Sequence, residues 1–209
     1  MNAWDKILRE EWYSQDEPDE IVINFASLLA KEKKIRVLDL GCGAGRHQVY
    51  MARQGFEAHG IDFSETGLGL TKERLKKQKL DGHIVKCDMK MLPYIDACFD
   101  AVITLHAIYH QKIRGIQKTF SEINRILKKD GFLLMNFLSK RTYSYGRGTR
   151  IEEGTFVEQE GIEKGVLHHF ADREEIEHLF KNFKIIDSKL REEEVEGKLR
   201  SRWIVTARK

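Results

Sequence analysis

Short apolar runs alternate with longer amphipathic stretches along most of this chain. Apolar runs of about four to eight residues, bounded by turn residues, are typical of buried strands. Such runs predict strands at 35–40, 56–62, 83–88, 99–105 and 131–138. Helices are predicted before or between them, at 19–31, through 50–53, at 64–79 and at 113–127. Strands that alternate with helices indicate a parallel sheet with helices on both faces.

The clearest helix signal lies at 113–127. Its apolar side chains recur on one helical face, at Ile113, Ile116, Phe120, Ile123 and Leu127. The sequence KKDG follows at 128–131. Cations ahead of a glycine are typical of a helix C-terminus, so we expect the helix to end there.

The alternation stops at residue 139. Residues 139–165 are polar and glycine-dotted, with no sustained period. A loop of this length inside a compact domain is usually functional or disordered, and its aromatic residues argue against full disorder. We interpret 139–170 as an insertion that covers a substrate site.

Regular structure is predicted again after the insertion. Asp172 and Glu175 have the spacing of a helix-start capping box, which predicts a helix at 171–182. Residues 183–194 and 198–209 have the pattern of two strands joined by a turn at 196–197. This terminal hairpin is expected to run antiparallel to the rest of the sheet.

Composition narrows the class of protein. The 209 residues are 41% hydrophobic and 33% charged, and we expect a single domain, 1–209. No segment approaches the roughly 18 apolar residues of a membrane helix, and the charged N-terminus is unlike a signal peptide, so a cytoplasmic location is expected. A net charge of +3 without a basic block does not suggest a nucleic-acid partner. The three cysteines, Cys42, Cys87 and Cys98, are too few and too scattered for a disulfide framework.

A glycine-rich loop follows the first predicted strand. Residues 37–47 read VLDLGCGAGRH, with Asp39 two residues before the first of three glycines. Glycines between a strand and a helix let a ligand reach backbone N–H groups. The nicotinamide fingerprint G-x-G-x-x-G does not fit, because Arg46 stands where its third glycine would be.

Acidic residues end three successive predicted strands. Asp39 ends the first, Asp62 the second and Asp88 the third. Asp62 is placed to accept both ribose hydroxyls of a nucleoside, although a charge at the next helix N-terminus is the structural alternative. Because an anionic pyrophosphate would sit poorly beside Asp39, this row of acids favours a cationic or nucleoside ligand.

The segments VLDLGCGAGRH, GIDFS, KCDMKMLPY, FDAVITLHAIYH and INRILKKDGFLLMNF carry a family resemblance. In order and spacing they resemble the motifs of class I S-adenosylmethionine-dependent methyltransferases of the small-molecule, type 11 kind, over residues 35–138. The resemblance implies an α/β fold: a Rossmann-like, seven-stranded, mostly parallel sheet with helices on both faces and a C-terminal antiparallel hairpin. It also implies S-adenosylmethionine as cofactor, S-adenosylhomocysteine as product and a small-molecule methyl acceptor.

The resemblance also implies cofactor-binding roles by position. The glycine loop and the acid before it would hold the methionine end, the second acid the ribose, and the third acid the adenine amino group. The residues so implied are Asp39, Gly41, Cys42, Gly43, Gly45, Asp62, Phe63, Asp88, Met89 and Leu105. Residues 1–33 would form an N-terminal helical lid with Trp12 and Tyr13 as candidate lid residues; an amphipathic helix anchor is the alternative.

Candidate catalytic residues follow the fourth strand, in the sequence HAIYH: His106, Tyr109 and His110. Methyl transfer requires an aligned acceptor and exclusion of water, and a base only where the acceptor loses a proton. The i, i+4 spacing would place both histidines on one face of a helical turn. Three interpretations stay open: a general base or substrate-orienting group, a metal pair, and polar residues lining the rim. No metal is expected, since a pair would need a third ligand, from His168 or His169.

Five residues are predicted to contact the substrate. They are Tyr143, Tyr145 and Arg147 in the insertion, and His168 and His169 after it. The insertion is therefore expected to set the choice of substrate.

Other functions stay open at this stage. A nicotinamide oxidoreductase would suit Asp62 but neither Asp39 nor Arg46, and a non-catalytic S-adenosylmethionine-binding protein would keep every cofactor position. A protein or nucleic-acid acceptor is also an alternative, although nucleic acid is not expected without a basic groove or an Asn/Asp-Pro-Pro-aromatic motif. The acceptor atom and the oligomeric state do not follow from these residues.

Overall fold

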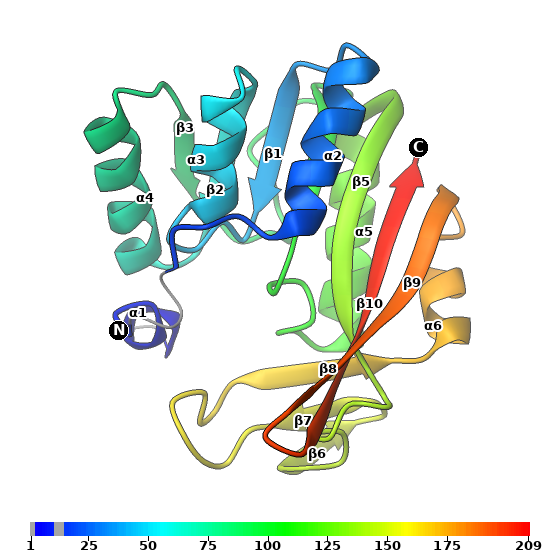
Figure 1. Cartoon of the computed structure of the whole chain (residues 1–209). Helices are drawn as coiled ribbons and strands as arrows, with labels where there is room; N and C mark the ends of the chain where they lie inside the picture. The colour runs from blue at the N-terminus through cyan, green and yellow to red at the C-terminus, as the bar shows by residue number, and fades with distance from the viewer. Residues whose placement is uncertain (1–2, 11–14) are drawn as a thin grey trace.

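A continuous sheet runs through the computed structural model, which describes residues 3–10 and 15–209 (Figure 1). Seven of its strands lie in the order β3-β2-β1-β4-β5-β10-β9. Their bounds are His83–Lys86 (β3), Glu57–Asp62 (β2), Arg36–Leu40 (β1), Phe99–Thr104 (β4), Leu127–Ser139 (β5), Lys198–Arg208 (β10) and Lys184–Val195 (β9). The pairs from β3 to β5 are parallel, whereas β10 is antiparallel to β5 and β9. The expected Rossmann-like sheet with an antiparallel terminal hairpin is confirmed.

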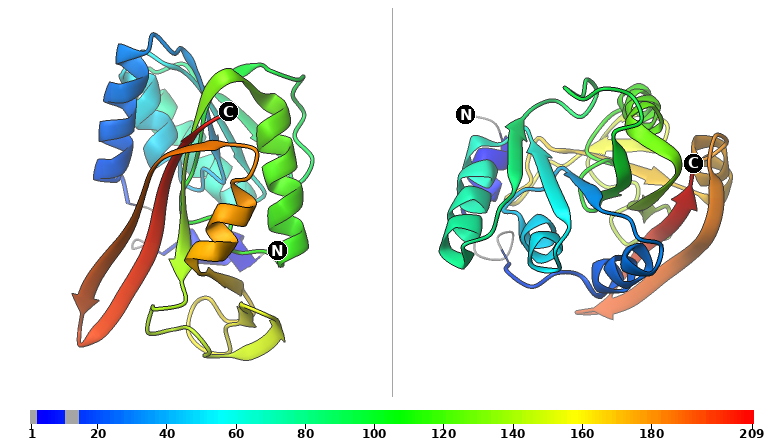
Figure 2. Two further views of the ribbon diagram at one scale, coloured as in Figure 1. Left: turned by 90° about the vertical axis from the view of Figure 1, so that its right-hand side faces the viewer. Right: turned by 90° about the horizontal axis from the view of Figure 1, so that it is seen from above.

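Helices cover both faces of the sheet (Figure 2). One face carries α2 (Glu20–Lys31), α3 (Arg46–Arg53) and α4 (Glu65–Gln78), and the other α5 (Ile113–Ile126) and α6 (Arg173–Leu179). Successive side chains of a strand point to opposite faces. Accordingly Val37 packs in the α2 core, and Leu38 and Leu40 pack in the α5 core. Burial on both faces explains why β1 is a continuous apolar run rather than an alternating one.

Side-chain caps set three of the helix starts. Asp19 accepts a hydrogen bond from the N–H of Ile21 ahead of α2, and Ser64 accepts one from Gly67 ahead of α4. Asp172 accepts from the N–H of Glu175 at 3.0 Å, as the capping-box spacing predicts. These contacts satisfy backbone donors that the helices themselves leave unpaired.

The junction of α5 and β5 differs from the expectation. The helix ends at Ile126, and KKDG belongs to β5, which already begins at Leu127. Leu127 pairs with Phe99 of β4, and the register shifts before Ala101. Asp130 takes a left-handed conformation, with φ of 62°, inside this irregular stretch. The parallel ladder with β4 therefore overrides the local helix-end signal.

The insertion is also more regular than its sequence indicates. It forms β6 (Thr149–Glu152) and β7 (Thr155–Val157), which pair antiparallel with each other, and β7 pairs with β8 (Leu167–Ala171). β8 joins the end of β5 through two register pairs. Strands of three and four residues are too short to show a period-2 pattern, so the sequence could not predict them.

No helix within residues 3–10 and 15–209 has the length and apolar character needed to cross a bilayer.

Candidate functional site

The carboxyl ends of β1, β2, β3 and β4 meet at one edge of the sheet, the edge toward which the β1 arrow points in Figure 1. The loops that leave these ends hold the glycines, Asp88 and the HAIYH sequence, and Asp39 and Asp62 lie in the last residues of β1 and β2. Ligands of open α/β sheets bind outside this edge. The candidate site is therefore the space bordered by these four loops.

Two positions of the glycine loop, Gly41 and Gly45, leave no room for a side chain. Gly41 and Gly45 have φ of 80° and 81°, a region that favours glycine. A Cβ atom on Gly41 would lie 2.4 Å from the Cβ of Ala107, and one on Gly45 would lie 2.5 Å from Oγ1 of Thr71. The Cys42 side chain is buried, so this residue offers its backbone. The loop thus presents peptide groups to a ligand.

Asp62 orders the loop that follows β2. Its Oδ2 accepts from the N–H of Gly43 at 2.8 Å and its Oδ1 from the N–H of Ser64 at 2.7 Å. Burial raises the pKa of Asp62, while these backbone donors lower it. The side chain is therefore held in one orientation beside the glycine loop. Each carboxylate oxygen has a second acceptor site for a ligand hydroxyl.

Asp39 lies deeper, beneath the loop. It is 3% exposed, and its Oδ2 accepts from the N–H of Gln48 at 3.1 Å. Burial raises its pKa to about 7; the Gln48 N–H and the charge of Arg46 lower it, and the charge of Asp62 raises it. A cation bound next to Asp39 would favour its ionised form.

The pKa of Asp39 predicts how stability varies with pH. The native state holds this proton more tightly than the unfolded chain, so the free energy of unfolding should fall as pH rises from about 4 toward about 7. The contribution reaches at most about 1.4 kcal/mol per pH unit. Asp39→Asn should remove it, because the amide oxygen still accepts from Gln48 and does not titrate. Urea unfolding across this pH range tests the prediction, with Asp81→Asn, an exposed acid, as control. An unchanged pH slope in Asp39→Asn would contradict it.

Two neighbouring basic residues belong to the site although the sequence analysis assigned them no role in it. Arg46 begins α3 and its charge affects the pKa of Asp39. His47 is buried, and its Nε2 has no hydrogen-bond partner in the described part of the chain. Burial, followed by the charges of Arg46 and His106, holds the pKa of His47 well below its usual range. Both residues end the VLDLGCGAGRH motif, so their position directly after the last glycine was the available sequence signal.

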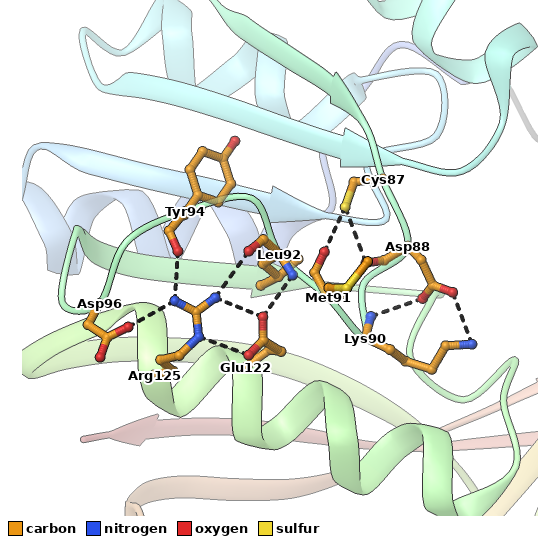
Figure 3. Close-up of polar contacts among 9 residues, drawn as sticks. All are labelled: Cys87, Asp88, Lys90, Met91, Leu92, Tyr94, Asp96, Glu122 and Arg125. Atoms are coloured by element: carbon orange, nitrogen blue, oxygen red, sulfur yellow. Dashed lines mark hydrogen bonds and ion pairs between the residues drawn. The ribbon is translucent and has the colours of Figure 1, made fainter.

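Asp88, drawn in Figure 3, and Met89 follow the end of the third strand. Oδ1 of Asp88 accepts from the N–H of Lys90 at 2.9 Å, and Oδ2 lies 3.0 Å from Nζ of Lys90. Sδ of Met89 accepts a hydrogen bond from Nε2 of Gln111 at 3.0 Å. Cε of Met89 lies 3.5 Å from the position that a Cβ on Gly41 would take. Met89 therefore borders the glycine loop, and its role as a cofactor contact stays a prediction.

Arg125 of α5 holds the segment after Asp88 in place (Figure 3). Its guanidinium donates to the backbone oxygens of Leu92 and Tyr94 at 3.1 and 2.6 Å. It also donates twice to Glu122, at 2.8 Å each, and Glu122 in turn accepts from the N–H of Leu92 at 2.7 Å. This fork fixes the path of the loop that carries Asp88.

The HAIYH sequence is a turn rather than a helix. Residues 105–112 have no helical assignment, and His106 is left-handed with φ of 57°, so the expectation of one helical face is wrong. The His106 N–H donates to Oδ1 of Asn136, and its Nδ1 lies 3.3 Å from the Tyr109 hydroxyl. Arg202 of β10 lies close enough to that hydroxyl to lower the pKa of Tyr109, against the larger effect of burial. Arg202 is remote in sequence, and no sequence signal indicated it.

The His110 side chain closes the site toward β8. Its Nδ1 lies 2.9 Å from the backbone oxygen of Leu167, and its ring lies 5.0 Å from that of His168. The Trp4 ring packs edge-on against it at 4.6 Å. Burial and, after it, the charge of His168 lower the pKa of His110 to about 4. The structure thus brings His110 and His168 together.

The N-terminal helix α1 (Ala3–Ile7) lies over the glycine loop. Asp5 accepts from the hydroxyl of Ser64 at 2.7 Å and from the N–H of Thr66 at 3.2 Å. Leu8 is buried, with Cδ2 3.5 Å from the position of a Cβ on Gly43. These contacts suit the predicted lid. The proposed lid residues Trp12 and Tyr13 lie outside the described residues.

His169 has structural contacts. It is 1% exposed, with Nδ1 2.7 Å from Oγ1 of Thr155 and Nε2 2.7 Å from Oε1 of Glu175. Both ring nitrogens are therefore engaged in joining β7 to α6, which leaves none for a metal or a substrate.

Tyr143, Tyr145 and Arg147 of the insertion make contacts that do not involve the glycine loop or the HAIYH turn. Tyr143 packs against Arg147 and Lys198, and Tyr145 packs against Phe156 and Phe170. A hollow of about 400 Å³, lined wholly by residues within 143–160, includes Tyr143 and Arg147. The structure does not join this hollow to the glycine loop, and the roles of Tyr143, Tyr145 and Arg147 stay predictions.

Leu105 and Phe63 are the two remaining residues predicted to contact the cofactor. Leu105 is buried behind β4 in the α2 core. Phe63 is 57% exposed directly after Asp62, with Nζ of Lys86 5.9 Å from its ring centroid. An exposed aromatic ring beside the Asp62 carboxylate is suitable for stacking on a nucleobase.

Comparisons with known proteins agree with this architecture. A family model described as a methyltransferase domain matches residues 38–135. YqeM of Bacillus subtilis, whose name assigns it provisionally to the methyltransferases, is 30% identical over 146 residues, which are 69% of this chain and 57% of that protein. The chain spans about half the length of the curated relatives it matches.

Solved structures with the same fold include an S-adenosylmethionine-dependent methyltransferase from Methanosarcina mazei. It has a TM-score of 0.77 at 19% identity, with 92% of this chain and 98% of that chain covered. Magnesium protoporphyrin IX methyltransferase from Synechocystis, solved with bound S-adenosylhomocysteine, has a TM-score of 0.67 at 16% identity, with 91% and 82% covered. At these identities the likeness concerns the fold.

Proposed function

We propose that the chain is a class I S-adenosylmethionine-dependent methyltransferase and that it transfers a methyl group from S-adenosylmethionine to a small-molecule acceptor. One observation carries the proposal: the buried carboxyl group of Asp39 lies beneath a loop in which Gly41 and Gly45 have no room for a side chain. Such a loop offers backbone donors, and the acid beneath it selects for positive charge.

The residues at the edge fit the methionine end of this cofactor. Asp39 would hold its ammonium group, and the backbone of 41–45 would surround its aliphatic part. Arg46 and the unpartnered Nε2 of His47 supply a cation and a polar atom for its carboxylate. The bound cofactor supplies a methyl group that its sulfonium already activates toward displacement.

The adenosine end fits the next two strand ends. Asp62 would accept the ribose hydroxyls on the acceptor sites that Gly43 and Ser64 leave open. Phe63 would pack against the adenine, and Asp88 would accept from its amino group. Leu8, directly after α1, would cover the loop and help to exclude water.

The acceptor is proposed to reach the methyl group between His106, Tyr109 and His110. Burial lowers the pKa of His106 to about 3 and that of His110 to about 4, so both imidazoles are neutral and weak bases at pH 7. Burial raises the pKa of Tyr109 to about 12. These groups therefore orient the acceptor rather than remove its proton.

Cationic side chains near His106 favour an acceptor that is already anionic. Arg202 contacts Tyr109, and Arg191 is its register partner on β9. Both charges contribute to the low pKa of His106, after burial. A thiolate, phenolate or carboxylate would be attracted to this position and would need no general base.

The direct test is release of S-adenosylhomocysteine. The protein should bind S-adenosylmethionine with a rise in melting temperature, and it should release S-adenosylhomocysteine when a metabolite extract is added. Fractionation of the extract by anion exchange should enrich the acceptor. Binding without release from any extract would support a non-catalytic binding protein. A thermal shift with NAD and none with S-adenosylmethionine would support an oxidoreductase instead.

A further inference from the structure

A second polar cluster lies at the opposite edge of the sheet from the glycine loop. It consists of Glu57 and His59 near the start of β2 and His83 at the start of β3. His59 and His83 are register partners on adjacent parallel strands. Glu57 and His59 are two residues apart on one strand and therefore point to the same face.

The side chains of this cluster converge. The rings of His59 and His83 stack with centroids 4.4 Å apart, and Nε2 of His59 lies 3.2 Å from Oε1 of Glu57. One ligand atom from each of the three residues can be chosen so that all lie within 4.8 Å of one another. Within residues 3–10 and 15–209, Glu57, His59 and His83 are the one set of three His, Cys, Asp or Glu residues with this spacing. No such set includes His106, His110, His168 or His169. The metal alternative for the HAIYH histidines is therefore not supported.

The donor set is that of a transition-metal site. Two imidazole nitrogens and one carboxylate oxygen are ligands that Zn²⁺ and neighbouring divalent ions accept, with a fourth position open to water.

A neighbouring hydroxyl orients the half-buried ligand His59. Nδ1 of His59 lies 3.5 Å from the Tyr94 hydroxyl, and the His59 ring packs edge-on against Phe99 at 5.1 Å. A metal-bound histidine usually donates its other ring N–H to such a partner. Nε2 of His59, on the side of Glu57, is thereby left for the ion.

Arg36 is the group that competes with a metal here. Its Nη2 and Nε both lie 2.8 Å from Oε1 of Glu57. The Arg36 side chain is 41% exposed, so it can turn into solvent when an ion binds. His83 is exposed and can adjust its rotamer to shorten the ligand spacing. Binding therefore replaces one surface ion pair, which contributes little to stability.

We propose that Glu57, His59 and His83 form a binding site for a divalent first-row transition metal, with Zn²⁺ as the expected ion. The site joins β2 to the edge strand β3 at the end of the sheet remote from the methyl-transfer site. Because the ligands converge only in the folded chain, bound metal should stabilise the native state.

Metal titration of the chelator-treated protein tests the proposal. ZnCl₂ should raise the melting temperature, and CoCl₂ should give the visible absorption of a tetrahedral site. His83→Ala and Glu57→Gln should each weaken metal binding at least about tenfold. His178→Ala, which removes an exposed histidine from α6, is the matched control and should bind as the native protein does.

Two outcomes would overturn the proposal: no response of the native protein to either metal, or equal responses in His83→Ala and His178→Ala. The thermal shift with S-adenosylmethionine is measured in the same variants. It should be unchanged in all of them, which separates failure of the metal site from failure of the proposed methyl transfer.

Discussion

Asp62→Ala is expected to reduce the affinity for S-adenosylmethionine between roughly 10²- and 10⁴-fold. Two hydrogen bonds from ribose hydroxyls to a carboxylate contribute about 1.5–3 kcal/mol each, which corresponds to this range. The substitution also releases the N–H groups of Gly43 and Ser64, which Asp62 holds at 2.8 and 2.7 Å. The cofactor loop therefore loses both a ligand contact and its internal support.

Calorimetric titration of S-adenosylmethionine and S-adenosylhomocysteine measures this effect. Asp62→Asn separates the two causes, because its amide oxygen can still accept from one of the two backbone donors. Asp81→Ala, an exposed acid between α4 and β3, is the control and should bind as the native protein does. Circular dichroism and a urea transition establish that Asp62→Ala is folded. A folded Asp62→Ala protein with native affinity would contradict the assignment of the ribose site.

Gly41→Ala is expected to destabilise the protein by about 2–5 kcal/mol. A left-handed conformation costs an alanine about 1–2 kcal/mol. The added Cβ would also lie 2.4 Å from the Cβ of Ala107, and overpacking of this kind costs about 1–3 kcal/mol more. Gly41 therefore marks the close approach of the loop after β1 to the turn after β4.

Gly69→Ala is the matched control for this substitution. Gly69 lies inside α4, and nothing lies within 4 Å of the position its Cβ would take. Alanine is the better helix former, so this variant should be stabilised by about 0.5–1 kcal/mol. Urea midpoints of the two variants should therefore move in opposite directions. Equal effects would mean that Gly41 is not confined as the structure describes.

Much of the central sheet is predictable from local pattern. β1 and α5 are each identified by their own apolar residues, because burial on both faces gives β1 a continuous apolar run and burial on one face gives α5 a helical period. The acids Asp39, Asp62 and Asp88 were expected at the strand ends and lie there. A strand end is a local property, and parallel strands bring their ends to one edge without further information.

Other features depend on contacts that sequence spacing does not encode. The i, i+4 spacing of His106 and His110 indicated a helical turn, yet the backbone N–H of His106 bonds to Asn136 of β5 and the segment is not helical. Histidine is a residue type common in functional sites, so the sequence indicated a substrate contact at His169. Only its two hydrogen bonds, to Thr155 and Glu175, show a structural role.

The sequence by itself determined how the central strands and helices alternate along the chain, the glycine loop and the row of acids. Each of these depends on neighbouring residues and on general rules of parallel sheets. Only the tertiary structure decided which remote side chains meet there. Trp4 against His110, Arg202 against Tyr109, and the convergence of Glu57, His59 and His83 all join separate elements. The physical reason is that packing, not spacing, sets the distance between residues on different elements.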